Sequence, residues 1–553
     1  MESAILTAME RTQKTSFIRG AAILAVTSII CKVLGVLFRV FAIKILGEDG
    51  MYFYEKVYPT YSWLLIISSS GIPIAISRMV ASRIARENNR DAGKVFHKAF
   101  WMLFILGILT TSVMFFGADP IARFLLDSSN PGMRYSLMAL APALFFTSIL
   151  CAYRGYLQGL QRMTGTSISQ LAEQVFKMIF GLMLAAVLAG KYAGTPYEAA
   201  AGSVGILLGV TISELLAVAV IYPVYRRESG ILSVDSSENS ESADEKIIRT
   251  LFAIAIPITL GASILPIANV LDSAMITRLL VTSGVEAHDA ERLYVILCTY
   301  VRSIINLPAR LSTSLAMAVV PAIAEAAARN EGQSVKQLTS MSIKLAMAVG
   351  VPCAVGLSVL ARPIIFLLYR HIIPESLYIA QSLMHIAAFT VVFISLSQTA
   401  TGALQGIGRQ RIPLYFLLIG GITKVFVNLV FIRIPEIGIY GAVFSNLACY
   451  GIAGILDTVV LIRVTQAKLS LMDTFIKPIA ASAVMGVVAW GIYRGIGLLL
   501  NTERYLYSAT ACIAAVLAAV ITYLVLVLFL KVFSKNELMR IPGGRKLLRF
   551  ARD

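Results

Sequence analysis

The chain has 553 residues, of which 58% are hydrophobic and 14% charged, and its mean hydropathy is +0.78. A soluble globular chain is usually about 45–50% apolar and about a quarter charged, so this composition excludes a soluble protein and indicates a polytopic integral membrane protein. The net charge of +17 would suit nucleic-acid binding, but the basic residues lie at the ends of the apolar stretches, as the positive-inside rule requires.

The first apolar stretch, 17–46, is long enough to cross a bilayer yet carries Lys32, Arg39 and Lys44. A cation in mid-membrane costs roughly a few kcal/mol unless it faces a partner or water. Lys32 and Arg39 are seven residues apart and therefore fall on nearly the same helix face. We interpret Lys44 as an interface anchor whose ammonium reaches the headgroups. Lys32 and Arg39 are better explained as the lining of a basic, water-filled cavity.

An all-α fold with about fourteen membrane-spanning helices is predicted, because about 20 apolar residues cross a bilayer. The predicted spans are 17–46, 57–82, 95–117, 133–160, 167–190, 199–225, 247–281, 291–325, 337–361, 375–405, 412–433, 439–464, 474–498 and 506–533. Basic residues cluster in alternate connections, which places both termini in the cytoplasm. The N-terminal residues lack the apolar core of a cleavable signal peptide.

The chain is internally duplicated. Gly155-Tyr-Leu-Gln-Gly-Leu-Gln-Arg162 matches Gly402-Ala-Leu-Gln-Gly-Ile-Gly-Arg409, 247 residues further on, and Lys177 and Lys424 keep that spacing. The glycine pairs in both segments predict close helix packing. Six spans separate the copies, so two six-helix lobes of parallel topology are expected around a central cavity, an arrangement that transporters use.

A Ser-rich, acidic segment divides the two halves and is typical of a flexible cytoplasmic linker. We therefore predict five regions: an N-terminal lobe at 1–225, the linker at 226–246, a C-terminal lobe at 247–464, two helices outside the duplication at 465–533, and a basic cytoplasmic tail at 534–553.

Several polar residues lie deep in the predicted spans. Asn306 is one turn from both Arg302 and Arg310, so these three form a polar face. Asp272 either neutralises one of the arginines or helps to bind a coupling cation. Arg78, at the end of the second span, is either a cavity residue or a topology signal.

Lys177 and Lys424 lie mid-span at equivalent places in the two halves, where a cation needs a specific explanation. Glu173, one turn before Lys177, is a candidate partner for it.

Enzymatic chemistry is not indicated. The six cysteines and four histidines are scattered and show neither metal-ligand spacing nor a disulfide framework. No nucleophile–base arrangement or phosphate-binding loop is present, so we expect no enzyme, no metal and no cofactor.

The charge pattern selects the cargo. A cationic cavity attracts anions, and phosphate is a favoured partner of Arg and Lys. An exporter of cationic drugs would be expected to present carboxylates, and away from their ends the spans carry few, namely Glu173, Glu214, Asp272 and Asp457. A transporter of an anionic, phosphate-bearing amphiphile is therefore predicted.

Three segments carry a resemblance to a known family. Ile30-Cys-Lys32-Val-Leu-Gly35, followed by Arg39 and Lys44-Ile-Leu-Gly47, resembles the first-helix signature of the MurJ and SpoVB lipid flippases. Gly71-Ile-Pro-Ile-Ala-Ile-Ser-Arg78 resembles the SpoVB and YtgP branch, as does the segment 311–325. The resemblance covers nearly the whole chain and implies the fold of the multidrug/oligosaccharidyl-lipid/polysaccharide (MOP) exporters.

The resemblance also implies a function. Such proteins transfer an undecaprenyl-pyrophosphate-linked cell-wall precursor, lipid II, across the bacterial cytoplasmic membrane, in peptidoglycan or spore-cortex synthesis. It implies that Lys32 and Arg302 are cavity cations, with Arg39 displaced along the helix. The second-helix arginines of MurJ have no counterpart in 64–70. A sodium site between the seventh helix and the eleventh and twelfth is also implied, for which Asp272 and Asn428 are the candidates; the expected coupling ion is sodium or a proton.

The predicted substrate-binding residues are Lys32, Arg39, Arg78, Lys177, Arg302, Asn306, Arg310 and Lys424. The expected partners are the lipid-linked glycan, membrane lipids and cell-wall synthesis proteins, without nucleic acid. Three alternatives remain: a flippase for another lipid-linked polysaccharide precursor, a cation-coupled multidrug exporter, and a scaffold for cell-wall synthases.

Overall fold

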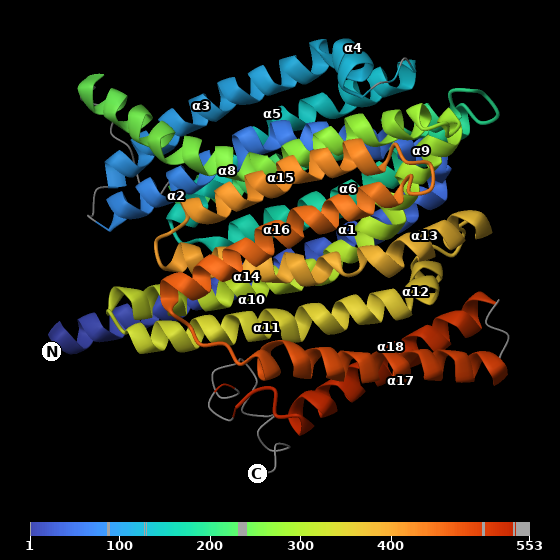
Figure 1. The fold of residues 1–553 in the computed structure, drawn as a ribbon. Coiled ribbons are helices and arrows are strands. Elements are labelled where there is room, and N and C mark those ends of the chain that lie inside the picture. Colours follow the sequence, from blue (N-terminus) through green and yellow to red (C-terminus); the bar gives the residue numbers. More distant parts are fainter. Residues whose placement is uncertain are drawn as a thin grey trace. The chain divides into compact units, whose positions relative to one another are not determined.

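The computed structural model describes residues 2–85, 89–126, 128, 130–229, 241–499, 504–534 and 537. Within these ranges the side chains of 2–22, 25, 89–90, 229, 241–246, 310–319 and 321 lie outside the description. The chain forms two compact units, an N-terminal unit of Met1–Ala274 and a C-terminal unit of Met275–Asp553. All regular elements of the described residues are helical, as predicted (Figure 1).

The N-terminal unit follows the predicted spans closely. Its elements are α1 (Glu2–Ser69), α2 (Gly71–Ile84), α3 (Asn89–Phe116), α4 (Ala118–Pro120), the π-helix Ile121–Leu125, α5 (Pro131–Gly159), α6 (Met163–Lys191), α7 (Glu198–Ser229) and most of α8 (Glu241–Thr282). The ends of the predicted linker are helical, because α7 continues to Ser229 and α8 begins at Glu241. The rest of that linker lies outside the described residues, and the predicted lobe boundaries stay predictions.

The first two predicted spans are joined by one residue rather than by a loop. Within α1 only Gly47 leaves the helical region, with φ 66° and ψ −175°. Arg39 and Glu55 lie on either side of it and form an ion pair of 2.9 Å. In a straight helix the sixteen residues between them would span roughly 24 Å. The chain therefore reverses at Gly47, and helix resumes where the sequence predicted a connection up to residue 56.

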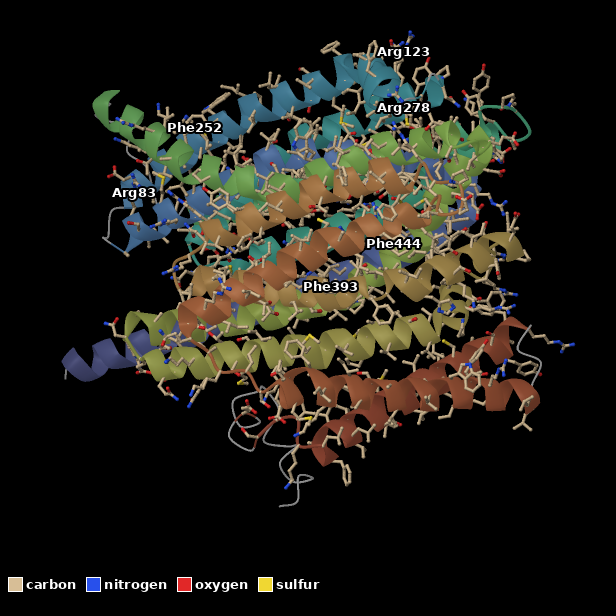
Figure 2. The ribbon with its side chains drawn as sticks, viewed as in Figure 1. Arg83, Arg123, Phe252, Arg278, Phe393 and Phe444 are labelled. Atoms are coloured by element: carbon tan, nitrogen blue, oxygen red, sulfur yellow. The ribbon has the colours of Figure 1, made fainter. Side chains whose placement is uncertain are left out.

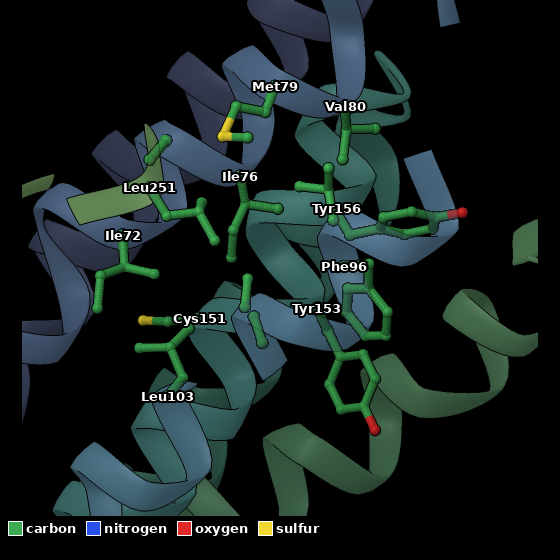
Figure 3. Packing of buried hydrophobic residues seen from close by; sticks show 14 of the residues in the cluster. Ile72, Ile76, Met79, Val80, Phe96, Leu103, Cys151, Tyr153, Tyr156 and Leu251 are labelled. Carbon is green, nitrogen blue, oxygen red and sulfur yellow. The ribbon is translucent and has the colours of Figure 1, made fainter. Parts of the chain in front are cut away.

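The core of the N-terminal unit is built where α2, α3 and α5 meet. Ile76, Phe96 and Tyr156 belong to one buried cluster there (Figure 3). A Cβ on Gly155 would lie 2.9 Å from the carbonyl oxygen of Pro73, and one on Gly159 would lie 2.8 Å from the Cβ of Val80. The first predicted glycine pair therefore lets α5 approach α2, so its interpretation as a packing motif is confirmed.

The C-terminal unit contains the remaining predicted spans. Its elements after α8 are α9 (Ala287–Val295), the π-helix Ile296–Arg302, α10 (Ser303–Ala328), α11 (Gly332–Val359), α12 (Ala361–Leu368), α13 (Pro374–Ala387), α14 (Thr390–Gly406), α15 (Arg411–Phe431), α16 (Tyr440–Thr465), the π-helix Met472–Ile476, α17 (Lys477–Leu499) and α18 (Tyr505–Phe529). The eighth predicted span is thus interrupted by a π-helix, and the tenth is bent by 43° between α13 and α14.

The duplication is visible in the packing within each unit. In the N-terminal unit α5 packs against α2, α3 and α7, and α6 packs against α7. In the C-terminal unit α14 packs against α10, α11 and α16, and α15 packs against α16. These neighbours correspond helix by helix, with α5 equivalent to α14, which carries the matching glycine motif; α5 packs in addition against α1.

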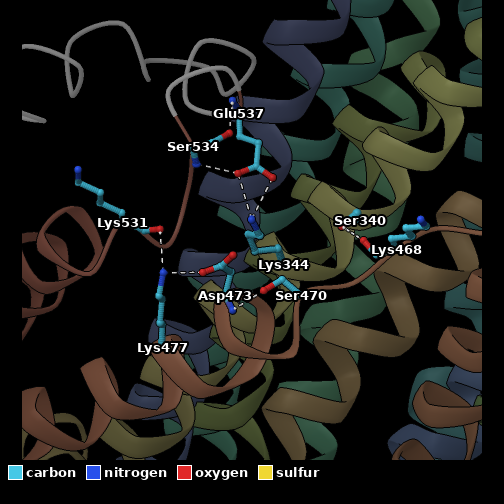
Figure 4. Close-up of polar contacts among 9 residues, drawn as sticks. All are labelled: Ser340, Lys344, Lys468, Ser470, Asp473, Lys477, Lys531, Ser534 and Glu537. Carbon is cyan, nitrogen blue, oxygen red and sulfur yellow. Dashed lines mark hydrogen bonds and ion pairs between the residues drawn. The ribbon is translucent and has the colours of Figure 1, made fainter. Parts of the chain in front are cut away.

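The last two helices, α17 and α18, pair with each other and pack against α11 and α12. A polar cluster holds the segment that follows α18: Lys344 Nζ lies 3.0 Å from both carboxylate oxygens of Glu537 (Figure 4). The Glu537 carboxylate also accepts a hydrogen bond of 2.8 Å from the backbone N–H of Ser534. One lysine of α11 therefore holds the start of the predicted tail, whose remainder lies outside the described residues.

Ten helices of the described part are long and apolar enough to cross a membrane, or eleven if the bent pair α13 and α14 counts as one span. The predicted total of fourteen stays a prediction. Many large apolar side chains are exposed on these helices (Figure 2). The basic residue Arg83, by contrast, lies at a helix end, in the last turn of α2. Exposed apolar surface of this extent is expected when lipid rather than water surrounds the helices.

Candidate functional site

The reversal at Gly47 positions the first ion pair of the N-terminal unit. It brings Arg39 back to Glu55, and their side chains are 22% and 7% exposed. Part of the Arg39 charge is therefore neutralised within α1 itself. Glu55 lies in the stretch that the sequence predicted to be a connection, which is why it was not recognised as a partner.

A second ion pair joins α5 to α6. Arg154 Nη2 lies 2.9 Å from Glu173 Oε2, and Arg154 Nε donates a hydrogen bond of 2.9 Å to Ser169 Oγ. The predicted pairing of Glu173 with Lys177 is therefore wrong. Glu173 points to the neighbouring helix α5, where the guanidinium of Arg154 offers several donors in a fixed plane. An ion pair with Lys177, one turn along the same helix, would be weaker.

Lys177 lies among aromatic rings instead. Its Nζ is 4.8 Å from the ring centroid of Phe38 and 5.1 Å from that of Tyr58. Tyr58 stacks on Tyr54 with centroids 5.2 Å apart. A cation over a ring face gains roughly 0.5–2 kcal/mol and keeps its full charge. This environment therefore holds a lysine ammonium in the membrane without cancelling it.

Glu214, on α7, is a further carboxylate of this region, to which the sequence analysis assigned no role. It is 5% exposed, and its Oε2 is buried with no hydrogen-bond partner among the described residues. The charged side chains near enough to act on it are Glu173, Arg154 and Lys177. A buried carboxylate in this position is unusual, because such groups are normally paired or hydrogen-bonded.

We call these six residues the N-terminal polar network; they are Arg39, Glu55, Arg154, Glu173, Lys177 and Glu214. Sequence reasoning singled out only Arg39 and Lys177 as site residues. Arg154 was hidden beside the glycine motif, although a charge within an apolar span is itself a signal. The network comes from α1, α5, α6 and α7 and can hold an anion or move a proton.

Lys56 is a further buried cation that the sequence analysis missed. It is 0% exposed, and its Nζ donates hydrogen bonds to the carbonyl oxygens of Ser273, at 2.5 Å, and Leu126, at 3.4 Å. It ties α1 to α8 and to the end of the short π-helix Ile121–Leu125. Its carbonyl partners indicate a structural role.

In the C-terminal unit, Arg302 ends the π-helix Ile296–Arg302 and is partly buried. The wide turn is supported by Tyr369, whose hydroxyl donates to the carbonyl oxygen of Thr299 at 2.9 Å, and by Ser303, whose hydroxyl donates to that of Cys298 at 3.2 Å. Single-turn π-helices are frequent at functional sites. The structure thus gives Arg302 a special backbone position that helical periodicity cannot predict.

The other predicted residues of this unit are placed differently from one another. Asn306 is exposed, and the Arg310 side chain lies outside the described residues. Lys424 and Asn428, on α15, are 3% and 1% exposed. Asp457, on α16, is 1% exposed, and its Oδ2 accepts a hydrogen bond of 3.3 Å from Thr401 Oγ1.

The N-terminal unit carries three further predicted residues. Lys32 is partly buried on α1, Arg78 is exposed on α2, and Asp272 is 1% exposed on α8. Asp272 and Asn428 belong to different units, as do Lys32 and Arg302. The sodium site and the two-sided cavity therefore stay predictions.

Within the described residues no group of three or more His, Cys, Asp or Glu side chains is arranged to hold a metal ion. The six cysteines are free thiols, and four of them are buried. The site therefore consists of ion pairs, aromatic faces and buried carboxylates.

Comparison with known proteins assigns a family. The model of the family described as "Polysaccharide biosynthesis protein" matches residues 17–327, more than half of the chain. This chain belongs to the polysaccharide biosynthesis protein family. A second model, MatE, matches residues 298–430.

Two known proteins resemble the chain over almost its whole length. "Stage V sporulation protein B" of Bacillus subtilis (strain 168) is 23% identical over 97% of this chain and 100% of its own. "Lipid II flippase MurJ" of the same organism is 23% identical over 92% of this chain and 93% of its own. The solved structure "Lipid II flippase MurJ, inward closed conformation" has a TM-score of 0.67 at 15% identity and covers 92% of this chain and 99% of that one. The predicted family and MOP-type fold are confirmed.

Proposed function

We propose that this protein is a flippase that moves an undecaprenyl-pyrophosphate-linked cell-wall precursor, lipid II, across the bacterial cytoplasmic membrane. The observation that carries the proposal is the pair of cations at equivalent positions of membrane-spanning helices, Lys177 and Lys424. Lys177 keeps its charge over two aromatic rings. Placing a cation within a membrane costs free energy. Cations kept there are suited to bind an anionic substrate.

The family supports the coarser part of this function. Polysaccharide biosynthesis requires carriers for lipid-linked precursors, and the model of a polysaccharide biosynthesis family matches this chain. The relatives match over nearly full length rather than over one segment. Neither relative's name describes an enzyme, which supports transport as the activity.

The mechanism that we propose is alternating access. The pyrophosphate and sugar headgroup enters a basic cavity from the cytoplasm while the polyprenyl tail stays in lipid, and the two lobes then rock to release the headgroup outside. Moving one charge through 100 mV is worth about 2.3 kcal/mol, so the membrane potential can drive the return. Sodium bound at Asp272 and Asn428, or a proton, is the proposed coupling ion. Both termini are proposed to be cytoplasmic, with cell-wall synthesis proteins as partners.

One alternative has specific support. The two named relatives are equally identical to this chain, at 23%, yet only one is named a lipid II flippase. Overall identity therefore does not select the glycan, and another lipid-linked polysaccharide precursor is the second candidate. A cation-coupled multidrug exporter is disfavoured, because the cationic residues named above would repel a cationic drug.

The test is rescue of a bacterium depleted of its own lipid II flippase. We expect wild-type protein to restore growth and Lys32→Ala, Lys177→Ala and Arg302→Ala to fail at equal membrane abundance. The matched control is Lys44→Ala, since Lys44 lies on the same helix as Lys32 and is exposed.

Rescue by all three variants as good as by wild type would refute the cationic-site mechanism. Failure of a correctly inserted wild type would refute lipid II as the substrate and select the other glycan.

A further inference from the structure

The carboxylate of Glu214 has no role in the proposed transport cycle, although its position is costly. It is 5% exposed, and its Oε2 finds no hydrogen-bond partner among the described residues. A buried polar atom left without a partner costs about 1–3 kcal/mol, and more when it is charged. A group kept at that cost in a membrane helix is a candidate for function.

The groups near enough to act electrostatically on Glu214 lie on α1, α5 and α6, the helices with extensive packing against α7. From α5 they are Thr147, Cys151 and Arg154, and from α1 the group is Tyr61. From α6 they are Glu173 and Lys177. Both signs of charge therefore surround the carboxylate.

The charges of the N-terminal polar network nearly cancel in pairs. Arg39 is paired with Glu55, and Arg154 with Glu173, each at 2.9 Å. Lys177 and Glu214 are the remaining two members. While Glu214 is ionised, the six charges sum to zero; once Glu214 holds a proton, the charge of Lys177 is no longer balanced within the network.

A proton fits this position better than a metal cation. Hard cations need several oxygen ligands, typically six to eight for calcium. Here one carboxylate oxygen lacks a partner, and two of the nearby groups, Arg154 and Lys177, are themselves cations. A proton needs only that one lone pair.

We propose that Glu214 is a proton-binding site which switches the charge that Lys177 presents to an anionic ligand. A hydronium ion transfers its proton to Oε2: one O–H bond of hydronium breaks, the O–H bond of a neutral carboxylic acid forms, and water is released, with no other bond changed in the protein. The network then carries one net positive charge and binds an anion more tightly; loss of the proton restores neutrality and weakens binding. This inference rests on the proposed function for its ligand, but the proton site itself does not depend on it.

The ligand test uses the full chain in lipid nanodiscs with farnesyl pyrophosphate as the probe. Wild type should bind it about five- to tenfold more tightly at mildly acidic than at mildly alkaline pH, as expected for one unbalanced charge at an intermediate dielectric. Glu214→Gln should bind at the acidic affinity at both pH values, beyond the change that the probe's own titration causes. The exposed control Glu198→Gln, on the same helix, should behave as wild type.

The second readout needs no ligand. Infrared difference spectra between the two pH values should contain the C=O stretch of a buried protonated carboxyl, absent in Glu214→Gln and shifted in Glu214→Asp. Glu214→Asp keeps the carboxyl and should retain pH-dependent binding. It therefore provides the test if the glutamine variant fails to fold.

The outcomes separate the two ideas. A Glu214→Gln protein that keeps the wild-type carboxyl band and pH dependence overturns the proton site. A wild type that shows the band but never binds the probe refutes the pyrophosphate ligand and leaves the proton site standing.

Discussion

The two copies of the duplicated fold keep one lysine and surround it differently. Arg154 and Glu173, which form the ion pair beside Lys177, have Thr401 and Gly420 at the matching positions 247 residues later. Both members of the pair are therefore absent from the second copy. There, Thr401 donates its hydrogen bond to the buried Asp457 instead.

Helix packing gives the physical reason. In the N-terminal unit α6 and α7 are in close contact at Gly181 and Gly209, where a Cβ added to Gly209 would lie 2.2 Å from the Cα of Gly181. In the C-terminal unit the close approach of α15 to α16 is at Gly420, whose Cβ would lie 2.5 Å from the carbonyl oxygen of Cys449. At the position that matches Glu173, the second copy therefore has a glycine against the backbone of the next helix, where a side chain has no space.

The two copies therefore share most helix neighbours and the mid-span lysine but not the carboxylates. The first copy places its acids beside two cations, and the second places Asp457 beside a hydroxyl. Variants in either copy test this difference.

Arg154→Ala should break the first copy most severely. It leaves Glu173 without its partner and close to Glu214, and removing one member of a buried ion pair typically costs about 3–5 kcal/mol. Thermal unfolding in detergent should show this loss as a large fall in melting temperature.

The double variant Arg154→Met with Glu173→Met should recover much of the loss, since no unpaired charge remains. Equal stability of the single and double variants would mean that the unpaired Glu173 carboxylate does not destabilise the protein, contrary to this prediction.

Much of the fold could be predicted from the sequence, because the length and polarity of apolar stretches determine where membrane helices begin and end. The span predicted at 133–160 is observed as α5, Pro131–Gly159, and the repeated glycine motif correctly indicated duplicated packing. The site was predicted less well. The sequence showed that Lys177 is mid-span, but not that Phe38 and Tyr58 face it, since periodicity reports one helix and contacts depend on two.

The failures have the same origin. Glu173 was assigned to its neighbour along the helix because a sequence shows only local spacing, whereas its partner lies on α5. The reversal at Gly47 was missed because a left-handed glycine can replace a loop, and sequence spacing alone does not distinguish the two.

Gly420→Ala should damage the second copy by an intermediate amount. Its Cβ would meet the backbone of α16 at Cys449, and overpacking of this kind costs about 1–3 kcal/mol. Gly190→Ala is the matched control on α6, because nothing lies within 4 Å of its added Cβ. Unfolding in detergent should separate the two variants; equal stability would contradict the close approach that we hold responsible for the missing carboxylate.

Thr401→Val should have the smallest effect, because it removes a single hydrogen bond of 3.3 Å to Asp457 and keeps the side-chain shape. A typical hydrogen bond contributes about 0.5–1.5 kcal/mol, and this long one belongs at the lower end. Thr423→Val is the control, since Thr423 is half-buried and bonds only within its own helix, to the carbonyl oxygen of Ile419. Adding Asp457→Asn to Thr401→Val should cost less than the sum of the two single changes, because both remove one contact. If Thr401→Val instead cost as much as Arg154→Ala, the hydroxyl would be as important to the second copy as the ion pair is to the first, and the two copies would differ in chemistry but not in dependence on it.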